Sequence, residues 1–498
     1  MNPISLDPSR TPVLVGIGQS IERDGIASAI ELAERAAEAA LEDAPGLREK
    51  IQRVSVVAIS FSPVSLAPAT ELASALGLGD VECEVTTPGG NSPQWLVSRA
   101  CEQITKGELE TTLLVGAEAT RSMRQSDKGS DFFSTAIQDR SGEEGHQDKI
   151  VGVSVMDMLG QAEIEAGMIR PADIYPMFEN ALSAKLGHSP DEARARIATF
   201  YARGTEVAAR NPFAWFQQVQ SAGEIAEATP VNRATAEPYT RCMNSFPNVD
   251  QAAALLITTL ERATAAGLAG QCIFPAAAGH CADLVPVARE DLSASPAIRA
   301  ASEAAFGAAG VGLDDIDVFD LYSCFPIAVE TGAREIGLAL DDPRGLTQTG
   351  FMSFFGGPGN NYNMHGIAAV GLRLRETGTL GYVSGNGGAL SKHTIGVYGT
   401  EAPAGGFKLA DTSAAQAVIN ASAREIAFAA EGEATVVAGT VVYGRDGVPT
   451  AAPVIADLPD GRRIAAKASE EALRAVGGKA LEGRVIRVTG ANPPIYSV

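Results

Sequence analysis

The apolar positions of the chain follow one order of elements twice. Apolar residues recur at helical spacing over residues 26–41, from Ile26 to Leu41, and valines at 54–57 predict a strand after this helix. A second helix and strand are predicted over 295–319, where Ser295 and Pro296 form a helix-start signal.

A longer unit is also repeated. The segments "PGGNSPQWLVSRACEQITKGELETTLLVGAEA" and "PGNNYNMHGIAAVGLRLRETGTLGYVSGNGG" begin at Pro88 and Pro358. Each contains a glycine-rich loop, a helix with an apolar face, a glycine that ends the helix (Gly107, Gly378) and a buried strand. The repetition predicts a duplicated α/β core with helices on both faces of mixed sheets.

The pattern divides the chain into four parts. Residues 1–120 and 241–268 form the first half of the core, and 269–405 form the second half. Residues 121–240 are polar, carry charge clusters and are expected to join neither sheet, which indicates an inserted domain. After the linker-like "EAPAGG", residues 406–498 alternate short β-rich runs with Asp-Gly turns and a helix near 470–476, which predicts a small, separate β-rich or barrel-like domain.

Composition excludes several classes of function. The chain has 498 residues and a formal net charge of −21, which would repel nucleic acid and anionic membranes. The six cysteines form no CxxC pair, and the histidines show no metal spacing, so we expect reduced thiols and no metal site. The start of the chain has no secretory signal pattern and no apolar run is long enough to span a membrane, which favours a cytoplasmic location.

These segments resemble the thiolase superfamily over about the first 400 residues. The thiolase pattern C-x-S-G-x-x-A-V fits the first loop and helix without a gap at Gly90, Ser92, Val97, Ala100, Ile104 and Gly107. "ARNPFAWF" and "DIDVFDLYSCF" resemble the sterol-carrier-type thiolases, and "NMHG" resembles the loop that carries their catalytic histidine. The resemblance implies a five-layered αβαβα core, coenzyme A or acyl-CoA as ligand, no tightly bound cofactor, and a coenzyme A side in residues 121–240.

The resemblance also shows which family residues are missing. Gly90 stands at the position of the nucleophilic cysteine, the second family cysteine falls near Ser384, and Tyr322 replaces the Asn or His that opens the HDCF-type motif. In the family a thiolate attacks the acyl thioester, and glycine cannot do so. An acetyl-CoA acetyltransferase-like activity, by thiolysis or Claisen condensation, is therefore expected to be weak or altered.

Four side chains remain as catalytic candidates. His365 is a candidate base or oxyanion donor, His393 a second histidine that could reach the same pocket, Tyr322 a phenol that could polarise a carbonyl, and Cys324 a substitute nucleophile. Each also has an ordinary structural interpretation, as a packed or hydrogen-bonded core residue. The loop residues expected near the thioester are Gly90, Asn91, Ser92, Ser384 and Asn386.

Three functions therefore remain open. The first is a thiolase-type acyltransferase with altered activity. The second is a lyase that makes or breaks a carbon–carbon bond by aldol chemistry, and the third is a module that binds CoA esters, or a partner through its C-terminal domain, without turnover.

The oligomeric state also remains open. Glu82 and Glu84 lie on one face of the strand that pairs across the family's dimer axis, and like charges there oppose pairing. A monomer is therefore as plausible as a homodimer.

Overall fold

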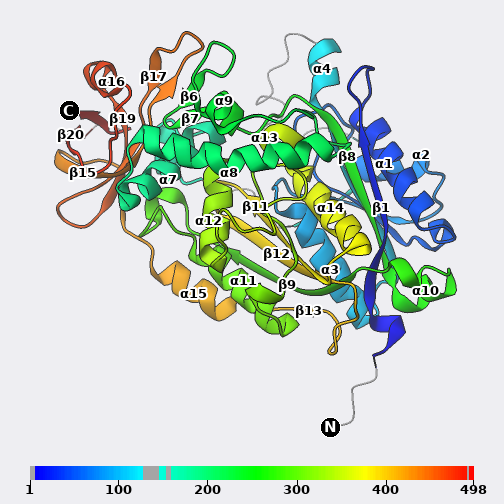
Figure 1. The fold of residues 1–498 in the computed structure, drawn as a ribbon. Coiled ribbons are helices and arrows are strands. Elements are labelled where there is room, and N and C mark those ends of the chain that lie inside the picture. Colours follow the sequence, from blue (N-terminus) through cyan, green and yellow to red (C-terminus); the bar gives the residue numbers. More distant parts are fainter. Residues whose placement is uncertain (1–5, 127–144, 153–158, 491–492) are drawn as a thin grey trace.

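Two mixed β-sheets separated by a pair of helices form the centre of the molecule (Figure 1). The structure, a computed structural model, describes residues 6–126, 145–152, 159–490 and 493–498. The first sheet has the order β1 (Pro12–Ile21), β8 (Asp250–Thr259), β4 (Thr111–Ala119), β2 (Arg53–Val56), β3 (Glu82–Thr86) and β5 (Lys149–Val151). The second has the order β10 (Val318–Asp320), β11 (Leu380–Gly387), β12 (Lys392–Gly399), β9 (Phe274–Ala282) and β13 (Lys408–Leu409).

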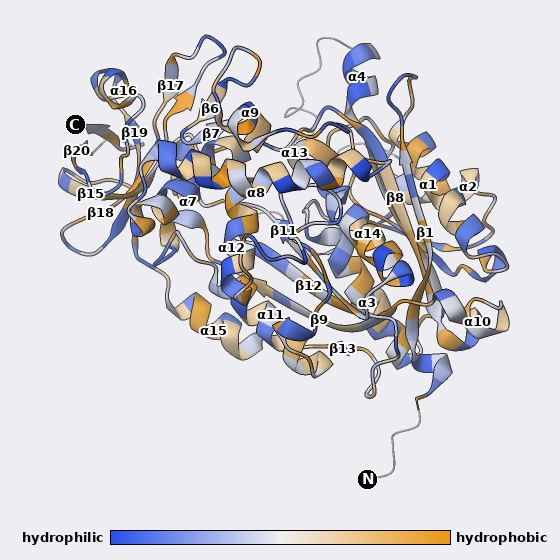
Figure 2. Cartoon of the chain, in the orientation of Figure 1, coloured by the Kyte–Doolittle hydropathy of each residue, from blue (hydrophilic) through white to orange (hydrophobic). Residues whose placement is uncertain are grey.

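Helices cover the outer face of each sheet and fill the space between the sheets. The first sheet is covered by α1 (Ala29–Asp43) and α2 (Pro68–Ala75), and the second by α11 (Pro296–Ala309) and α12 (Pro326–Ile336). The central helices α3 (Ser92–Lys106) and α14 (Tyr362–Glu376) contact each other and strands of both sheets. Hydrophobic residues concentrate on the strands and on the helix sides that face them (Figure 2). The result is the five-layered αβαβα core that the resemblance implies.

The duplication is confirmed by the order of elements. The succession β1, α1, β2, α2, α3, β4, β8 in the first half recurs as β9, α11, β10, α12, α14, β11, β12 in the second. Strand β3 has no counterpart in the second sheet within residues 159–490.

Local signals set the ends of the helices. Ser28 and Glu31 form a capping box, so α1 begins at Ala29. Ile26 therefore lies before the helix and is 59% exposed, not on its apolar face as expected. At the other end of a helix, Gly107 ends α3 with a φ of 72°, a conformation that favours glycine.

The inserted segment is joined to the rest of the molecule by β-pairing. It contains α6 (Gln161–Glu165), α7 (Pro171–Leu186), α8 (Pro190–Arg210), α9 (Ala222–Ala226), β6 (Ala234–Ala236) and β7 (Tyr239–Thr240). Its strand β5 pairs in parallel with β3, which corrects the expectation that this stretch joins neither sheet. A strand of three residues is too short to show an alternation of apolar and polar positions, so the sequence does not predict its pairing with the edge of β3.

The C-terminal region is a closed barrel of five strands. Its order is β19 (Arg463–Ala468), β18 (Val454–Asp457), β15 (Gly432–Gly439), β20 (Val485–Thr489) and β21 (Ile495–Ser497), and β21 pairs with β19 to close it. Strand β16 (Val442–Tyr443) pairs with β17 (Pro449–Ala451) and with β6 of the insert. The expected small barrel-like C-terminal unit is therefore confirmed, and its strands β16 and β17 also form a sheet with β6 and β7 of the insert.

The remaining elements connect these parts. They are α4 (Thr120–Ser126), α10 (Leu260–Ala265), α13 (Met352–Phe355), α15 (Ser413–Ala421), β14 (Ile426–Ala427) and α16 (Glu470–Val476). None of the described helices is long and apolar enough to cross a membrane.

The two glutamates of β3 were expected to carry unpaired charges that repel a second copy of the strand, but both have partners within the chain. Glu84 is fully buried and accepts hydrogen bonds from Ser55 Oγ at 2.7 Å and Arg99 Nη1 at 2.5 Å. Glu82 forms a salt bridge of 3.0 Å with Lys149 of β5. Both charges are neutralised within the chain, and the edge of β3 is occupied by β5.

Candidate active site

The glycine loops from the two halves of the chain meet between the sheets. Gly89 N donates to Asn360 Oδ1 at 2.9 Å, and Gln94 N donates to Asn363 Oδ1 at 3.1 Å. Asn363 Nδ2 donates to the carbonyl of Ser384 at 2.9 Å, which brings the end of β11 to the same point. The loops around residues 90, 360 and 385 thus form one site, as the duplication predicts.

Tyr322 fills the space that a side chain at position 90 would need. An ideal Cβ on Gly90 would lie 1.9 Å from Tyr322 Oη and 2.5 Å from the backbone oxygen of Asn386. Within the described residues the Tyr322 hydroxyl makes no hydrogen bond, although the side chain is almost completely buried. Burial raises its pKa well above the usual value, so the phenol is neutral and can donate a proton or a hydrogen bond.

Cys324 lies beside this phenol but is a poor nucleophile. Its sulfur accepts a weak contact of 3.7 Å from Asn386 Nδ2, and burial raises the pKa of the thiol to about 12. The thiolate is the reactive form, so little of it exists near neutral pH.

Tyr175 of α7 connects the site to the insert. Its hydroxyl donates to the carbonyl of Gly388 at 2.8 Å and accepts from Asn386 Nδ2 at 2.9 Å and Leu390 N at 3.0 Å. Its ring stacks on Phe325 at 4.5 Å. No motif in the sequence points to Tyr175, because a tyrosine among the apolar positions of a helix is typical of ordinary core.

His365 is a buried residue near the start of α14. It is fully buried in the second turn of α14, and Nδ1 is 2.7 Å from Gln19 Oε1 on β1. Its Nε2 has no hydrogen-bond partner in the part of the chain that the structure describes, and burial lowers its pKa to about 3. The lowered pKa keeps the histidine neutral, and its ring also packs on Phe355 at 5.0 Å. No hydrogen bond among the described residues joins it to Gly90 or Tyr322.

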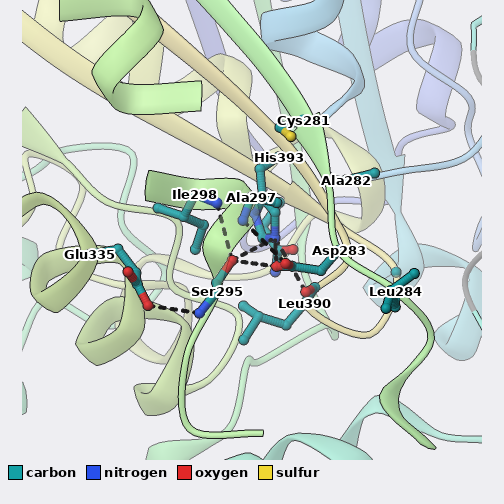
Figure 3. Close-up of polar contacts among 12 residues, drawn as sticks. Cys281, Ala282, Asp283, Leu284, Ser295, Ala297, Ile298, Glu335, Leu390 and His393 are labelled. Atoms are coloured by element: carbon teal, nitrogen blue, oxygen red, sulfur yellow. Dashed lines mark hydrogen bonds and ion pairs between the residues drawn. The ribbon is translucent and has the colours of Figure 1, made fainter. Parts of the chain in front are cut away.

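His393 lies on the far face of the second sheet, in the cluster drawn in Figure 3. Its Nε2 is 3.3 Å from Asp283 Oδ2, 3.4 Å from Ser295 Oγ and 3.2 Å from the carbonyl of Leu390. The next residue, Thr394, donates to the carbonyl of Asn91 at 3.1 Å, and neighbouring strand residues point to opposite faces. His393 therefore does not share the pocket expected for it.

The cluster around His393 stabilises the start of α11. Ser295 is the N-cap, and its Oγ donates to Asp283 while it accepts from the backbone N–H of Ile298. Burial opposes ionisation of Asp283, but the hydrogen bond from His393, the positive charge of Arg289 and the hydrogen bond from Ser295 together outweigh it and lower its pKa. The serine and the aspartate both face the same imidazole nitrogen, so the group lacks the order of a hydrolase triad.

The other loop residues predicted near the thioester have structural partners. The carbonyl of Asn91 accepts from Thr394 Oγ1 at 3.1 Å, and Ser92 Oγ donates to the carbonyl of Thr87 at 3.1 Å. Ser384 Oγ accepts from Tyr322 N at 3.0 Å, and Asn386 is held by Tyr175. The structure therefore gathers Gly90, Tyr322, Cys324 and Asn386, with Ser384 behind them.

No metal or disulfide contributes to this arrangement in the described residues. No group of three or more potential ligands (His, Cys, Asp or Glu) is placed to hold an ion there, and all six cysteines are free.

Comparisons with known proteins agree on the fold family. Residues 415–492 match the model of the thiolase-like protein type 1 additional C-terminal domain. A monomeric SCP2-thiolase like protein type 1 from Mycobacterium smegmatis superposes with a TM-score of 0.84 and 32% identity, covering 99% of this chain and 100% of that chain. The human mitochondrial 3-ketoacyl-CoA thiolase in complex with CoA shares the fold, with a TM-score of 0.56, 17% identity and coverage of 79% and 98%.

A more distant sequence relative is the acetyl-CoA acetyltransferase of Methanocaldococcus jannaschii. It is 26% identical over 178 residues, which are 34% of this chain and 44% of that protein. The chain thus matches less than half the length of this relative.

Proposed function

Because this chain belongs to the thiolase-like protein type 1 (SCP2-thiolase-like) family, we propose that it binds acyl-CoA thioesters where its glycine loops meet and acts on them without an acyl-enzyme. The complex of a thiolase of the same fold with CoA supports a CoA ester as ligand. Chemistry without an acyl-enzyme is supported by one observation. The phenol of Tyr322 occupies the space that a side chain at position 90 would need.

The geometry favours proton donation to a carbonyl. A thioester oxygen placed beside Gly90 would meet a neutral hydroxyl that has no other hydrogen-bond partner in the described residues. Such a donor stabilises negative charge that develops on oxygen, as an enolate or a tetrahedral species forms. In this proposal the protein has no cysteine-dependent thiolysis, and any acyltransferase activity that remains is weak or altered.

An aldol-type lyase is the second candidate, and the same phenol favours it. In retro-aldol cleavage the bond between the α- and β-carbons breaks, and its electron pair becomes a thioester enolate. Water takes the β-hydroxyl proton as the β-carbon becomes a carbonyl, and Tyr322 donates a hydrogen bond to the enolate oxygen. The enolate then takes a proton from water at its α-carbon, which gives the shortened acyl-CoA. No covalent enzyme intermediate is required.

The proposal also covers a binding role without turnover, the oligomeric state and the cellular role. A CoA-ester-binding role without turnover is the third candidate, with the anchored C-terminal barrel as the surface for a protein partner. We also propose a monomer, because β5 occupies the edge of β3, and a cytoplasmic role in lipid metabolism.

Product analysis distinguishes these candidates. The purified chain is incubated with acetoacetyl-CoA plus CoA, and separately with a β-hydroxyacyl-CoA, while calorimetry measures the binding of acetyl-CoA. Binding with aldehyde release that Tyr322→Phe abolishes supports the lyase, and binding with silence in both assays supports the binding module. Rapid thiolysis that Tyr322→Phe leaves unchanged, or no acyl-CoA binding at all, contradicts the proposal.

A further inference from the structure

The C-terminal barrel reaches the site around Gly90 through a chain of buried contacts. Residues 388–391 form the site turn, which joins β11 to β12. The turn follows Asn386, whose backbone oxygen lies 2.5 Å from the position of an ideal Cβ on Gly90. The placement of this turn therefore decides how much room the site offers beside Gly90.

The backbone of the site turn is strained, and three successive carbonyls hold it in place. Leu390 has a φ of 53°, which is unusual for a residue other than glycine. The carbonyl of Gly388 accepts from Tyr175 Oη at 2.8 Å. The carbonyls of Ala389 and Leu390 accept from Arg289 Nη2, each at 2.8 Å. A strained conformation persists only where the surrounding structure holds it, and Tyr175 and Arg289 supply that support.

Arg289 is itself held by the barrel. It is almost completely buried, and its guanidinium packs over the ring of Phe178 at 4.9 Å. Its backbone carbonyl accepts a hydrogen bond from Nη1 of Arg463, the first residue of barrel strand β19. Arg463 is buried as well, and its Nε donates to Asp457 of β18 at 2.7 Å. A buried charged donor that is paired in this way is costly to displace, so the barrel sets the position of Arg289.

A second route runs through α7, which lies against the barrel (Figure 1). Asn180 of α7 donates through Nδ2 to the carbonyl of Gly439 at the end of β15 and to the carbonyl of Glu237, both at 2.9 Å. Tyr175, earlier on the same helix, donates to the site turn and accepts from Asn386 Nδ2 at 2.9 Å. One helix thus joins a barrel strand to the turn and to the side chain that precedes it.

From these contacts we propose that the additional C-terminal barrel positions the active site. Arg463, Arg289 and Tyr175 are positioning residues, because they connect the barrel to the site turn and the turn sets the room beside Gly90. The hold of the barrel on the turn does not depend on the proposed function, whereas its effect on an acyl-CoA ligand rests on that function. Small displacements of the groups around a bound ligand lower affinity and rate steeply.

Hydrogen exchange measures the hold of the barrel on the turn without any ligand. Arg463→Gln removes the buried donor to the carbonyl of Arg289. Mass spectrometry should show exchange roughly tenfold faster than in the native chain in a peptide that contains Leu390, with the exchange of α3 unchanged. Arg462→Gln, the same substitution one position earlier, changes an exposed side chain that pairs with Asp460. It is the matched control and should leave both segments at the native exchange rate.

Calorimetry with acetyl-CoA measures the effect of the barrel on the site. Arg463→Gln and Tyr175→Phe should each weaken binding roughly tenfold, because each releases the site turn. The double variant should bind scarcely more weakly than either single variant, because both substitutions act through the same turn. Two independent effects would instead combine to a weakening of about a hundredfold.

Each outcome supports or overturns the proposal. Faster exchange confined to the site turn, together with the non-additive loss of affinity, supports it. Equal exchange in Arg463→Gln and Arg462→Gln, a rise spread evenly over the chain, or effects on affinity that simply multiply would overturn it. If the native chain binds no acetyl-CoA, the proposed function fails, and the exchange result alone still supports or overturns the hold of the barrel on the turn.

Discussion

Substitution of Gly90 by alanine gives the sharpest view of how the site is packed. The new methyl carbon would lie 1.9 Å from Tyr322 Oη and 2.5 Å from the carbonyl oxygen of Asn386. The second atom belongs to the backbone of β11, so it cannot move away by a side-chain rotation. Overpacking of this kind typically costs about 1–3 kcal/mol of unfolding free energy. Because the new methyl group would meet two atoms, we expect Gly90→Ala to lower the unfolding free energy by about 3 kcal/mol.

Two further variants separate the clash with Tyr322 from the general effect of replacing a glycine by alanine. Gly307 lies inside α11 with no atom near its missing Cβ, so Gly307→Ala should stabilise by up to about 1 kcal/mol. Tyr322→Phe removes the nearest clashing atom, and in that background Gly90→Ala should cost about 1 kcal/mol less.

Urea unfolding followed by tryptophan fluorescence measures the stability of the native chain, the three single variants and the double variant. The chain has two tryptophans, and Trp95 lies in α3 next to the site, so the signal reports the core. If Gly90→Ala is as harmless as Gly307→Ala, or if Tyr322→Phe leaves its cost unchanged, the placement of the phenol in the Gly90 space is wrong.

Three further predictions follow from burial and strand pairing. Because burial lowers the pKa of His365 to about 3 while the unfolded residue titrates near 6.5, its contribution is complete above pH 6.5 and is lost as the pH falls toward 3. The loss amounts to about 4–5 kcal/mol. The stability of His365→Gln, measured by thermal unfolding between pH 4 and 7, should therefore fall less with acid than that of the native chain, and parallel curves would contradict the shift. Cys324 should resist iodoacetamide at pH 8 in the native chain and react after unfolding, as read by peptide mass mapping, because burial raises its pKa to about 12. Modification of the native thiol at the rate of a free thiol would refute this. Sedimentation at micromolar concentration should show one species of 51.5 kDa, since β5 occupies the edge of β3, and a stable dimer would count against that reasoning.

Much of the fold was predictable because its signals are local. The spacing of apolar residues, the N-cap at Ser295 and the left-handed glycine at Gly107 depend only on nearby sequence, and each matches the structure. The repeated order of these units gave the two-sheet core, since identical successions of helices and strands bury their apolar faces in the same way.

The site was less predictable because its contacts are long-range. Gly90 and Tyr322 are 232 positions apart, and only the assembled sheets show that one fills the space of the other. His393 was expected near the loops, but a strand places alternate residues on opposite faces, and a shift of one position decides the outcome. Tyr175 and strand β5 come from the insert, where no repeat identifies their partners.

The measurement that tests the central claim most directly is a crystal structure of the chain with acetoacetyl-CoA bound. The account predicts an intact thioester between the loops at residues 90 and 386, with its carbonyl oxygen at a hydrogen-bond distance of about 2.6–3.2 Å from Tyr322 Oη. An acyl group on Cys324, or a thioester bound with Tyr322 out of reach, would contradict it.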